Sequence, residues 1–137
     1  MTTAPELPDK TGLPDNLDAV RTLPELLRWR VAQTPQSDAY LRYDETAGKW
    51  RPVSWHSIAE RIESITVALE SLDLPRGSRI GILLPNGLDA VCFDQAALAL
   101  AMVPVPMHAL DNPASIAYIL EDSEASVLVV SSMALWQ

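Results

Sequence analysis

Three short apolar segments separated by two helical segments most constrain the fold of this chain. The apolar segments are "RIGILLP" (79–85), "VPVP" (103–106) and "SVLVVSS" (126–132). The first shows no alternation of apolar and polar residues, which is typical of a strand covered on both faces. A strand–helix–strand–helix–strand order predicts right-handed connections and a parallel sheet. We therefore expect an α/β fold whose β-α-β-α-β unit has helices on both faces of the sheet.

The segment "VPVP" has an unusual composition for a strand, because proline lacks a backbone N–H. Successive residues of a strand direct their backbone groups to opposite neighbours, so Pro104 and Pro106 lose donors toward the same side. Val103, Val105 and Met107 keep their donors toward the other side. The pattern predicts a strand with one regular parallel neighbour and a weak or absent second one.

The front half of the chain predicts an arm, a helix, a hairpin and a second helix. Residues 1–20 are polar and rich in proline, which favours a flexible arm. The segment "TLPE" (22–25) matches a capping box at the start of a helix that Pro35 would end. Strand-like segments at 39–43 and 49–55 flank "DETAG", which predicts a β-hairpin.

The clearest helical pattern runs from 54 to 74, with Ser54 as the expected cap. Its apolar positions recur in steps of four and three and form one face: Ile58, Ile62, Ile65, Leu69 and Leu72. "PRG" (75–77) then turns the chain toward the first strand of the parallel sheet. Asn112 is expected to cap the helix that begins at Pro113.

Composition excludes several classes of partner. The net charge is −8 and the ten basic residues are scattered, so we expect neither nucleic acid nor an anionic membrane as a partner. The single cysteine, Cys92, rules out an internal disulfide and a cysteine metal cluster, and we expect it to be buried and inert. The first residues lack the pattern of a signal peptide, and no apolar run is long enough to span a bilayer. These features predict a cytoplasmic protein.

Ligands of open α/β sheets usually bind beyond the carboxyl ends of the strands. The turns there contain no G-x-G-x-x-G or P-loop pattern, and the chain has no G-x-S-x-G motif. Asn86 and Gly87 could offer N–H groups to an anion, but a tight turn capped by Asn86 is favoured, with Asp89 complementing the helix dipole. His108 follows the "VPVP" strand and is the one candidate for facing a substrate.

The other chemically active residues favour structural roles. His56 lies in the first turn of its helix, where we expect it to face solvent. Two histidines and one thiol far apart in sequence predict no metal site. The tryptophans are expected to pack rather than to stack bases, because no basic residues interleave with them; they are Trp29, Trp50, Trp55 and Trp136. The residues themselves therefore identify no catalytic group.

Six pieces of the chain occur in an order that carries further information. They are "TLPELL", the hairpin end "WRPVSW", the helix exit "LDLPRGSRI", then "ILLPN", "AALALAMVPVP" and "IAYILEDSEASVLVV". With these pieces the chain resembles, from about Thr22 to Ser132, the N-terminal part of AMP-forming adenylating enzymes, the superfamily of acyl-CoA synthetases, luciferases and peptide-synthetase adenylation domains. The tryptophan-containing hairpin and "PVPMH" are most similar to the medium- and long-chain fatty acyl-CoA synthetases.

This resemblance implies an ATP-dependent ligase of fatty acid metabolism that forms an acyl-adenylate from a carboxylic (fatty) acid and then a thioester with coenzyme A. The parent enzyme would use ATP, Mg²⁺ and coenzyme A. The family's phosphate loop, ribose-binding aspartate and catalytic lysine are absent from this sequence. Residues 21–137 are therefore expected to form a truncated N-terminal subdomain that is inactive alone and binds no cofactor. Ser78 and Ala101 stand where the family often has Asp and Gly.

Two alternatives to an enzyme fragment remain open. One is a stand-alone α/β interaction or regulatory domain, which predicts a stable monomer. The other is a receiver-like phosphoacceptor domain, which needs acidic partners that Asp111 lacks in the sequence. For an enzyme fragment we expect exposed apolar surface and hence self-association of the isolated chain.

Overall fold

The computed structural model describes residues 17–108, 110–132 and 134, and the chain divides into two compact units, 1–61 and 62–137. Of the expected arm at 1–20, residues 1–16 lie outside the described residues, so its flexibility stays a prediction. Within the remainder of that segment, Leu17–Ala19 form a short 3₁₀ helix (η1).

The first unit begins with the predicted capping box at helix α1 (Leu23–Gln33). The Glu25 N–H donates to Thr22 Oγ1 at 3.3 Å, and the Thr22 N–H donates to Glu25 Oε2 at 3.1 Å. The Arg21 N–H also donates to this carboxylate at 2.7 Å, and this bond is the main reason that the pKa of Glu25 lies below its usual value. The helix ends two residues before Pro35, as the sequence predicts.

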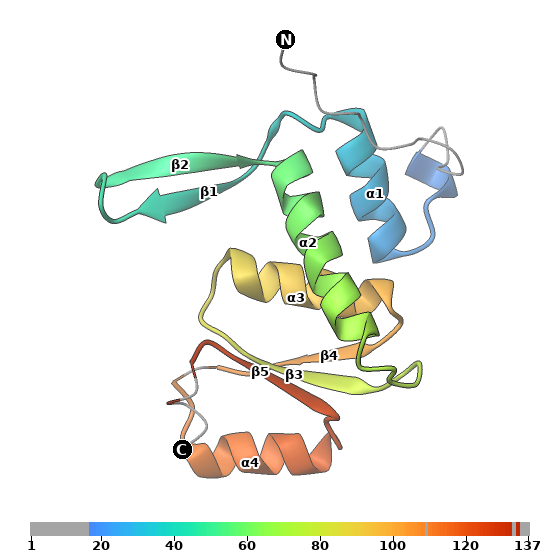
Figure 1. The fold of residues 1–137 in the computed structure, drawn as a ribbon, viewed down its shortest axis with the longest axis vertical. Helices are drawn as coiled ribbons and strands as arrows, with labels where there is room; N and C mark the ends of the chain where they lie inside the picture. Colours follow the sequence, from blue (N-terminus) through green and yellow to red (C-terminus); the bar gives the residue numbers. More distant parts are fainter. Residues whose placement is uncertain (1–16, 109, 133, 135–137) are drawn as a thin grey trace. The chain divides into compact units, whose positions relative to one another are not determined.

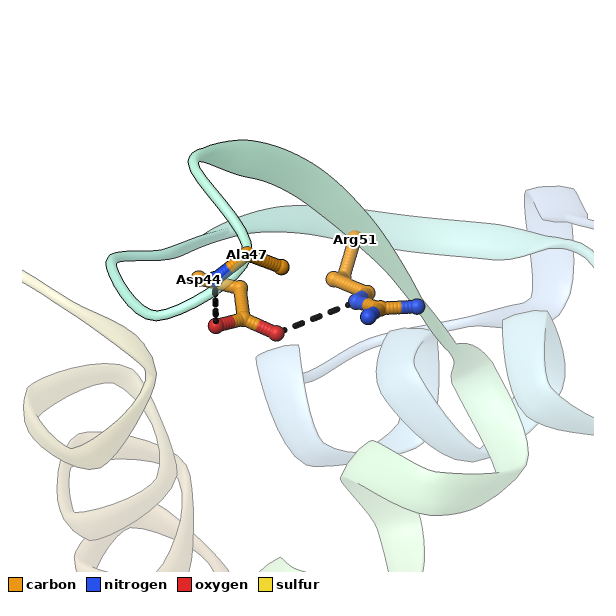
Figure 2. A network of polar contacts seen from close by, with 3 residues as sticks. All are labelled: Asp44, Ala47 and Arg51. Atoms are coloured by element: carbon orange, nitrogen blue, oxygen red, sulfur yellow. Dashed lines mark hydrogen bonds and ion pairs between the residues drawn. The ribbon is translucent and has the colours of Figure 1, made fainter.

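Strands β1 (Asp38–Asp44) and β2 (Lys49–Ser54) pair antiparallel as the predicted hairpin. Figure 2 shows how Asp44 closes its turn: the carboxylate accepts from the Ala47 N–H at 3.0 Å and from Arg51 Nε at 3.1 Å. The Ala47 N–H first, and Arg51 second, hold the pKa of Asp44 below its usual value. Gly48 supplies the left-handed residue of the turn, with φ +62°.

Helix α2 (Trp55–Glu70) begins where β2 ends. The predicted cap is confirmed, since Ser54 Oγ accepts from the Ser57 N–H at 3.2 Å. The predicted inclusion of Leu72 in this helix is wrong. The helix ends at Glu70, Asp73 turns the backbone with φ +50°, and the Leu72 side chain is left 49% exposed.

In the second unit, three parallel strands form one sheet in the order β4–β3–β5. The strands are β3 (Arg79–Leu83), β4 (Val103–Pro106) and β5 (Val127–Val130). Helices α3 (Leu88–Ala99) and α4 (Pro113–Asp122) lie on opposite faces of this sheet (Figure 1). The predicted β-α-β-α-β unit with helices on both faces is therefore confirmed.

The core of the second unit is built around the central strand, where Ile80, Ile82 and Leu83 are buried. Gly81 lets the covering side chains approach this strand. A Cβ at Gly81 would lie 2.9 Å from Leu120 of α4 and 3.0 Å from Met107. A side chain at position 81 would force the ends of these two side chains to shift, so glycine permits the close packing seen here.

Strand β4 is an edge strand, as its prolines predict. The Val103 N–H donates to the Ser78 carbonyl at 2.9 Å, and the Met107 N–H donates to the Ile82 carbonyl at 3.0 Å. Pro104 and Pro106 alternate with these donors and therefore face away from β3. The two missing N–H groups thus lie on the side where no described strand pairs with β4.

The turn between α3 and β4 passes through a strained residue. Ala101 has φ +54°, in the left-handed region that favours glycine. Its carbonyl accepts from the Gly77 N–H at 2.8 Å, and its own N–H donates to the Leu98 carbonyl at 3.0 Å. These bonds hold the conformation, whose positive φ would suit glycine better than alanine.

Candidate functional site

The carboxyl ends of the three parallel strands meet at one edge of the sheet, where ligands of open α/β folds bind. Three segments lie there: the turn at 84–87 after β3, Met107 and His108 after β4, and residues 131–132 after β5. These segments contain one ionisable side chain, that of His108. The polar side chains that these segments offer are the imidazole of His108, the amide of Asn86 and the hydroxyls of Ser131 and Ser132.

His108 is exposed, whereas the preceding Met107 is buried and bonded to β3. The His108 carbonyl accepts from the Asp111 N–H at 3.0 Å, which forms the turn that leads to the Asn112 cap of α4. Among the described residues, no hydrogen bond or ion pair holds the imidazole. His108 is thus positioned by its backbone and has no nucleophile or acid attached, and its substrate-facing role stays a prediction.

The predicted cap at Asn86 is wrong. Helix α3 begins one residue later, with Gly87 as its N-cap and no side-chain cap hydrogen bond. The Gly87 carbonyl accepts from the Val91 N–H at 3.3 Å. Asp89 lies in the first turn, where its carboxylate complements the helix dipole as expected. The negative charge at this helix start gives no support for an anion site.

The predicted exposure of His56 is also wrong. Its side chain is 25% exposed, and Nε2 lies 3.5 Å from Glu60 Oε1, one helical turn along α2. This contact gives His56 a structural role in the first unit. Cys92 is completely buried in the second unit, as predicted.

The tryptophans divide into packed and exposed residues. Trp29 and Trp55 carry buried indole nitrogens, and Trp55 contacts Tyr40 and the Arg30 guanidinium. The packing prediction is wrong for Trp50, which is 63% exposed and contacts only the edge of the Tyr43 ring among aromatic residues of the described chain. Trp136 lies outside the described residues.

No group of three or more His, Cys, Asp or Glu residues that could bind a metal ion occurs within the described ranges. Asp111 accordingly has no acidic cluster around it there, which disfavours a receiver-like domain. One carboxylate was not singled out from the sequence. Burial raises the pKa of Asp94 on α3, and a hydrogen bond from Gln95 at 3.4 Å offsets this only in part. Its signal in the sequence is an acid in the middle of an apolar helix, beyond the first turn that holds Asp89.

Residues 27–137 match the AMP-binding enzyme family. The chain belongs to this family. The resemblance carried by the six ordered sequence pieces is thereby confirmed.

Two curated relatives of this AMP-binding family member are named as fatty acid ligases. It is 35% identical over 86 residues to fatty acyl-CoA synthetase A of Dictyostelium discoideum. The aligned segment covers 63% of this chain and 13% of the relative. It is 26% identical over 104 residues to the long-chain-fatty-acid–CoA ligase FadD13 of Mycobacterium tuberculosis. The aligned segment covers 76% of this chain and 20% of the relative. The chain thus spans a fifth or less of the length of these relatives.

Solved structures of adenylating proteins share the fold. The N-terminal subdomain of Klebsiella oxytoca NpsA aligns with a TM-score of 0.74 at 16% identity, over 84% of this chain and 28% of that one. A fatty acyl CoA synthetase of Mycobacterium tuberculosis aligns with a TM-score of 0.67 at 23% identity, over 77% of this chain and 20% of that one. The α/β architecture of the AMP-binding family member is therefore that of an N-terminal adenylation subdomain.

No helix in the described part of this family member is both long enough and apolar enough to cross a bilayer.

Proposed function

We propose that this chain forms the N-terminal part of an ATP-dependent acyl-CoA synthetase. The observation that carries the proposal is the family match over residues 27–137, joined by curated relatives that are fatty acyl-CoA synthetases. In the proposed reaction a carboxylate oxygen attacks the α-phosphorus of ATP, and pyrophosphate leaves. The thiol of coenzyme A then loses its proton and attacks the acyl carbon. The bond between the acyl carbon and the phosphate oxygen breaks, and AMP leaves with its electron pair.

This chain contributes a folded unit rather than reacting groups. The described residues offer no set of metal ligands for Mg²⁺. The sequence has no loop rich in glycine and serine or threonine to hold the phosphates of ATP. We therefore assign ATP, Mg²⁺ and coenzyme A to other parts of a longer enzyme, and we expect the chain alone to be inactive.

The substrate that we infer is a fatty acid, and the proposed compartment is the cytoplasm. His108 is the candidate for contact on the substrate side, because it is exposed at the carboxyl edge of the sheet. In a longer enzyme that contains this chain, His108→Gln is expected to raise KM for the acid. An unchanged KM would remove His108 from the site.

An ATP–pyrophosphate exchange assay tests the proposal. The 137-residue chain is expected to show no exchange with a fatty acid, ATP and Mg²⁺, whereas a polypeptide that continues past Gln137 in the same reading frame is expected to show it. A stop codon directly after Gln137 would favour the stand-alone interaction or regulatory domain. Exchange by the chain alone would overturn its proposed inactivity.

We further propose that the isolated chain self-associates, since it exposes apolar surface in both units. In the first unit, one hairpin face carries Leu41, Tyr43 and Trp50, which are 60%, 49% and 63% exposed. In the second unit, no described strand pairs with the outer edges of β4 and β5. Sedimentation over a dilution series tests this proposal, and a monomer at every concentration would contradict it.

A further inference from the structure

The turn that joins β3 to α3 contains a pair of neighbouring residues that can react with each other. Asn86 and Gly87 lie in this turn, and both are exposed. The Gly87 carbonyl accepts from the Val91 N–H, but within the described ranges no hydrogen bond engages the Gly87 N–H or the Asn86 side-chain amide. The backbone nitrogen of Gly87 and the side-chain carbonyl carbon (Cγ) of Asn86 are therefore both available for reaction.

An asparagine that precedes glycine loses its side-chain amide in water without an enzyme. Here the Gly87 backbone nitrogen would give its proton to a solvent base and attack Cγ of Asn86, and ammonia would leave as a five-membered succinimide ring closes. Water then opens the ring. Attack of water at Cγ yields aspartate, and attack at the backbone carbonyl carbon yields isoaspartate, whose main chain runs through Cγ. Water is the one co-reactant, and nothing is oxidised or reduced.

Glycine at position 87 favours this ring closure, because no Cβ stands beside the attacking nitrogen and the glycine backbone adopts many conformations at low cost. The other two asparagines of the chain lack such a neighbour. Asn112 precedes Pro113, which has no N–H to lose. Asn16 precedes Leu17, whose side chain hinders attack by its backbone nitrogen. The sequence and the turn thus single out Asn86.

We infer that Asn86 is a site of spontaneous deamidation, which gives the neutral turn between β3 and α3 a negative charge. Residues 84–87 contain no ionisable side chain, so the new carboxylate would be the first in this turn. It would also add one negative charge to a chain whose net charge is −8. The isoaspartate form inserts one more backbone atom between β3 and α3. The carboxyl edge of the sheet therefore changes as the chain ages.

Mass spectrometry of the 137-residue chain, incubated for days at physiological temperature, tests this inference. Replacement of the amide by a carboxyl group raises the mass by about one unit, and we expect peptide fragmentation to place the gain at Asn86. The gain is expected to be faster at higher pH, because the attacking nitrogen must lose its proton. An isoaspartyl methyltransferase is expected to label the isoaspartate product. Asn112 is the internal control, since Pro113 blocks the same ring closure.

Two variants separate ring closure from other routes to the same mass. A Cβ at Gly87 would meet the Pro85 carbonyl oxygen at 4.0 Å, and the φ of 165° is extended backbone, so Gly87→Ala fits the turn. Gly87→Ala is expected to slow the mass gain at least about tenfold, because its Cβ hinders ring closure. Asn86→Gln keeps an exposed amide but requires a six-membered ring, so we expect it to abolish the gain at this position.

Three results would overturn the inference. They are an unchanged mass of the chain, a mass gain that lies only at residues other than Asn86, and a gain at Asn86 that Gly87→Ala does not slow. The last result would exclude attack by the Gly87 nitrogen as the limiting step. None of them bears on the proposed adenylating function or on self-association, because the reaction needs only two adjacent residues and water.

Discussion

Ala101 has a backbone angle that favours glycine, the residue expected at this position from the resemblance to the family. Its φ of +54° costs an L-residue with a Cβ more than it costs glycine. We expect Ala101→Gly to stabilise the chain by about 0.5–1 kcal/mol, because relief of this strain outweighs the added freedom of the unfolded chain. Thermal unfolding measures the change.

Ala99→Gly is the matched control, since Ala99 lies at the end of α3 without a positive φ. That substitution is expected to cost up to about 1 kcal/mol. If both variants lose stability to the same extent, Ala101 is not strained in the way described.

Asp94 gives a pH-dependent prediction at the same scale. Burial raises its pKa, so the charged form destabilises the folded chain at pH values above the folded pKa. Asp94→Asn is expected to raise the unfolding midpoint at neutral pH, and the gain should vanish as the pH falls below 3.8, the ordinary value for aspartate. The exposed Asp89 on the same helix is the control, because Asp89→Asn removes a favourable dipole contact and should bring no gain. An equal gain from both would contradict the role of burial.

Local sequence patterns predicted three helix caps correctly but did not predict the start of α3 or the exposure of Trp50. Thr22, Ser54 and Asn112 are caps as predicted, because a capping side chain and its N–H partner lie three residues apart. Asn86 was wrongly predicted as a cap, because α3 begins at Leu88, one residue later than a cap at Asn86 requires. The exposure of Trp50 depends on which hairpin face is covered, and the alternation of a strand alone does not determine that.

At the scale of elements, the prolines of β4 correctly predicted an edge strand. Replacing them tests what they prevent. Pro104→Val with Pro106→Val restores two outward N–H groups, so β4 gains the capacity to pair with another copy. We expect larger species in sedimentation than the unmodified chain forms, because the β4 edge is then able to pair.

Pro75→Ala is the control for that experiment, since Pro75 lies in an exposed turn. Its carbonyl accepts from the Ser78 N–H at 3.1 Å and from the Ser78 hydroxyl at 2.7 Å, and alanine keeps this carbonyl. A double variant that sediments like the unmodified chain would show that the prolines do not limit assembly.

Element order was easier to predict than element ends. The parallel sheet followed from three apolar segments and two intervening helices, since right-handed connections leave few other topologies. The end of α2 did not follow, because Leu72 continues the apolar face beyond the last helical residue. There the Ser71 hydroxyl bonds back to the Ala68 carbonyl at 2.6 Å, and Asp73 turns the chain. Hydrophobic periodicity does not reveal local bonds of this kind.

At the scale of the whole molecule, the fold and the family could be predicted and the reacting groups could not. The six ordered pieces encode strands, helices and turns, so they identify an architecture. Within the described ranges, no hydrogen bond or ion pair joins the His108 imidazole to another group, and no periodicity or spacing predicts which side chain of this edge would react. We therefore propose that this chain contributes structure rather than reacting groups to adenylation.

ATP–pyrophosphate exchange, run side by side on the 137-residue chain and on the polypeptide that continues past Gln137, tests this central claim most directly. With a fatty acid, ATP and Mg²⁺, the account predicts no exchange above the protein-free reaction for the chain and clear exchange for the longer polypeptide. Exchange by the 137-residue chain itself, or none by a folded longer polypeptide with any fatty acid, would contradict it.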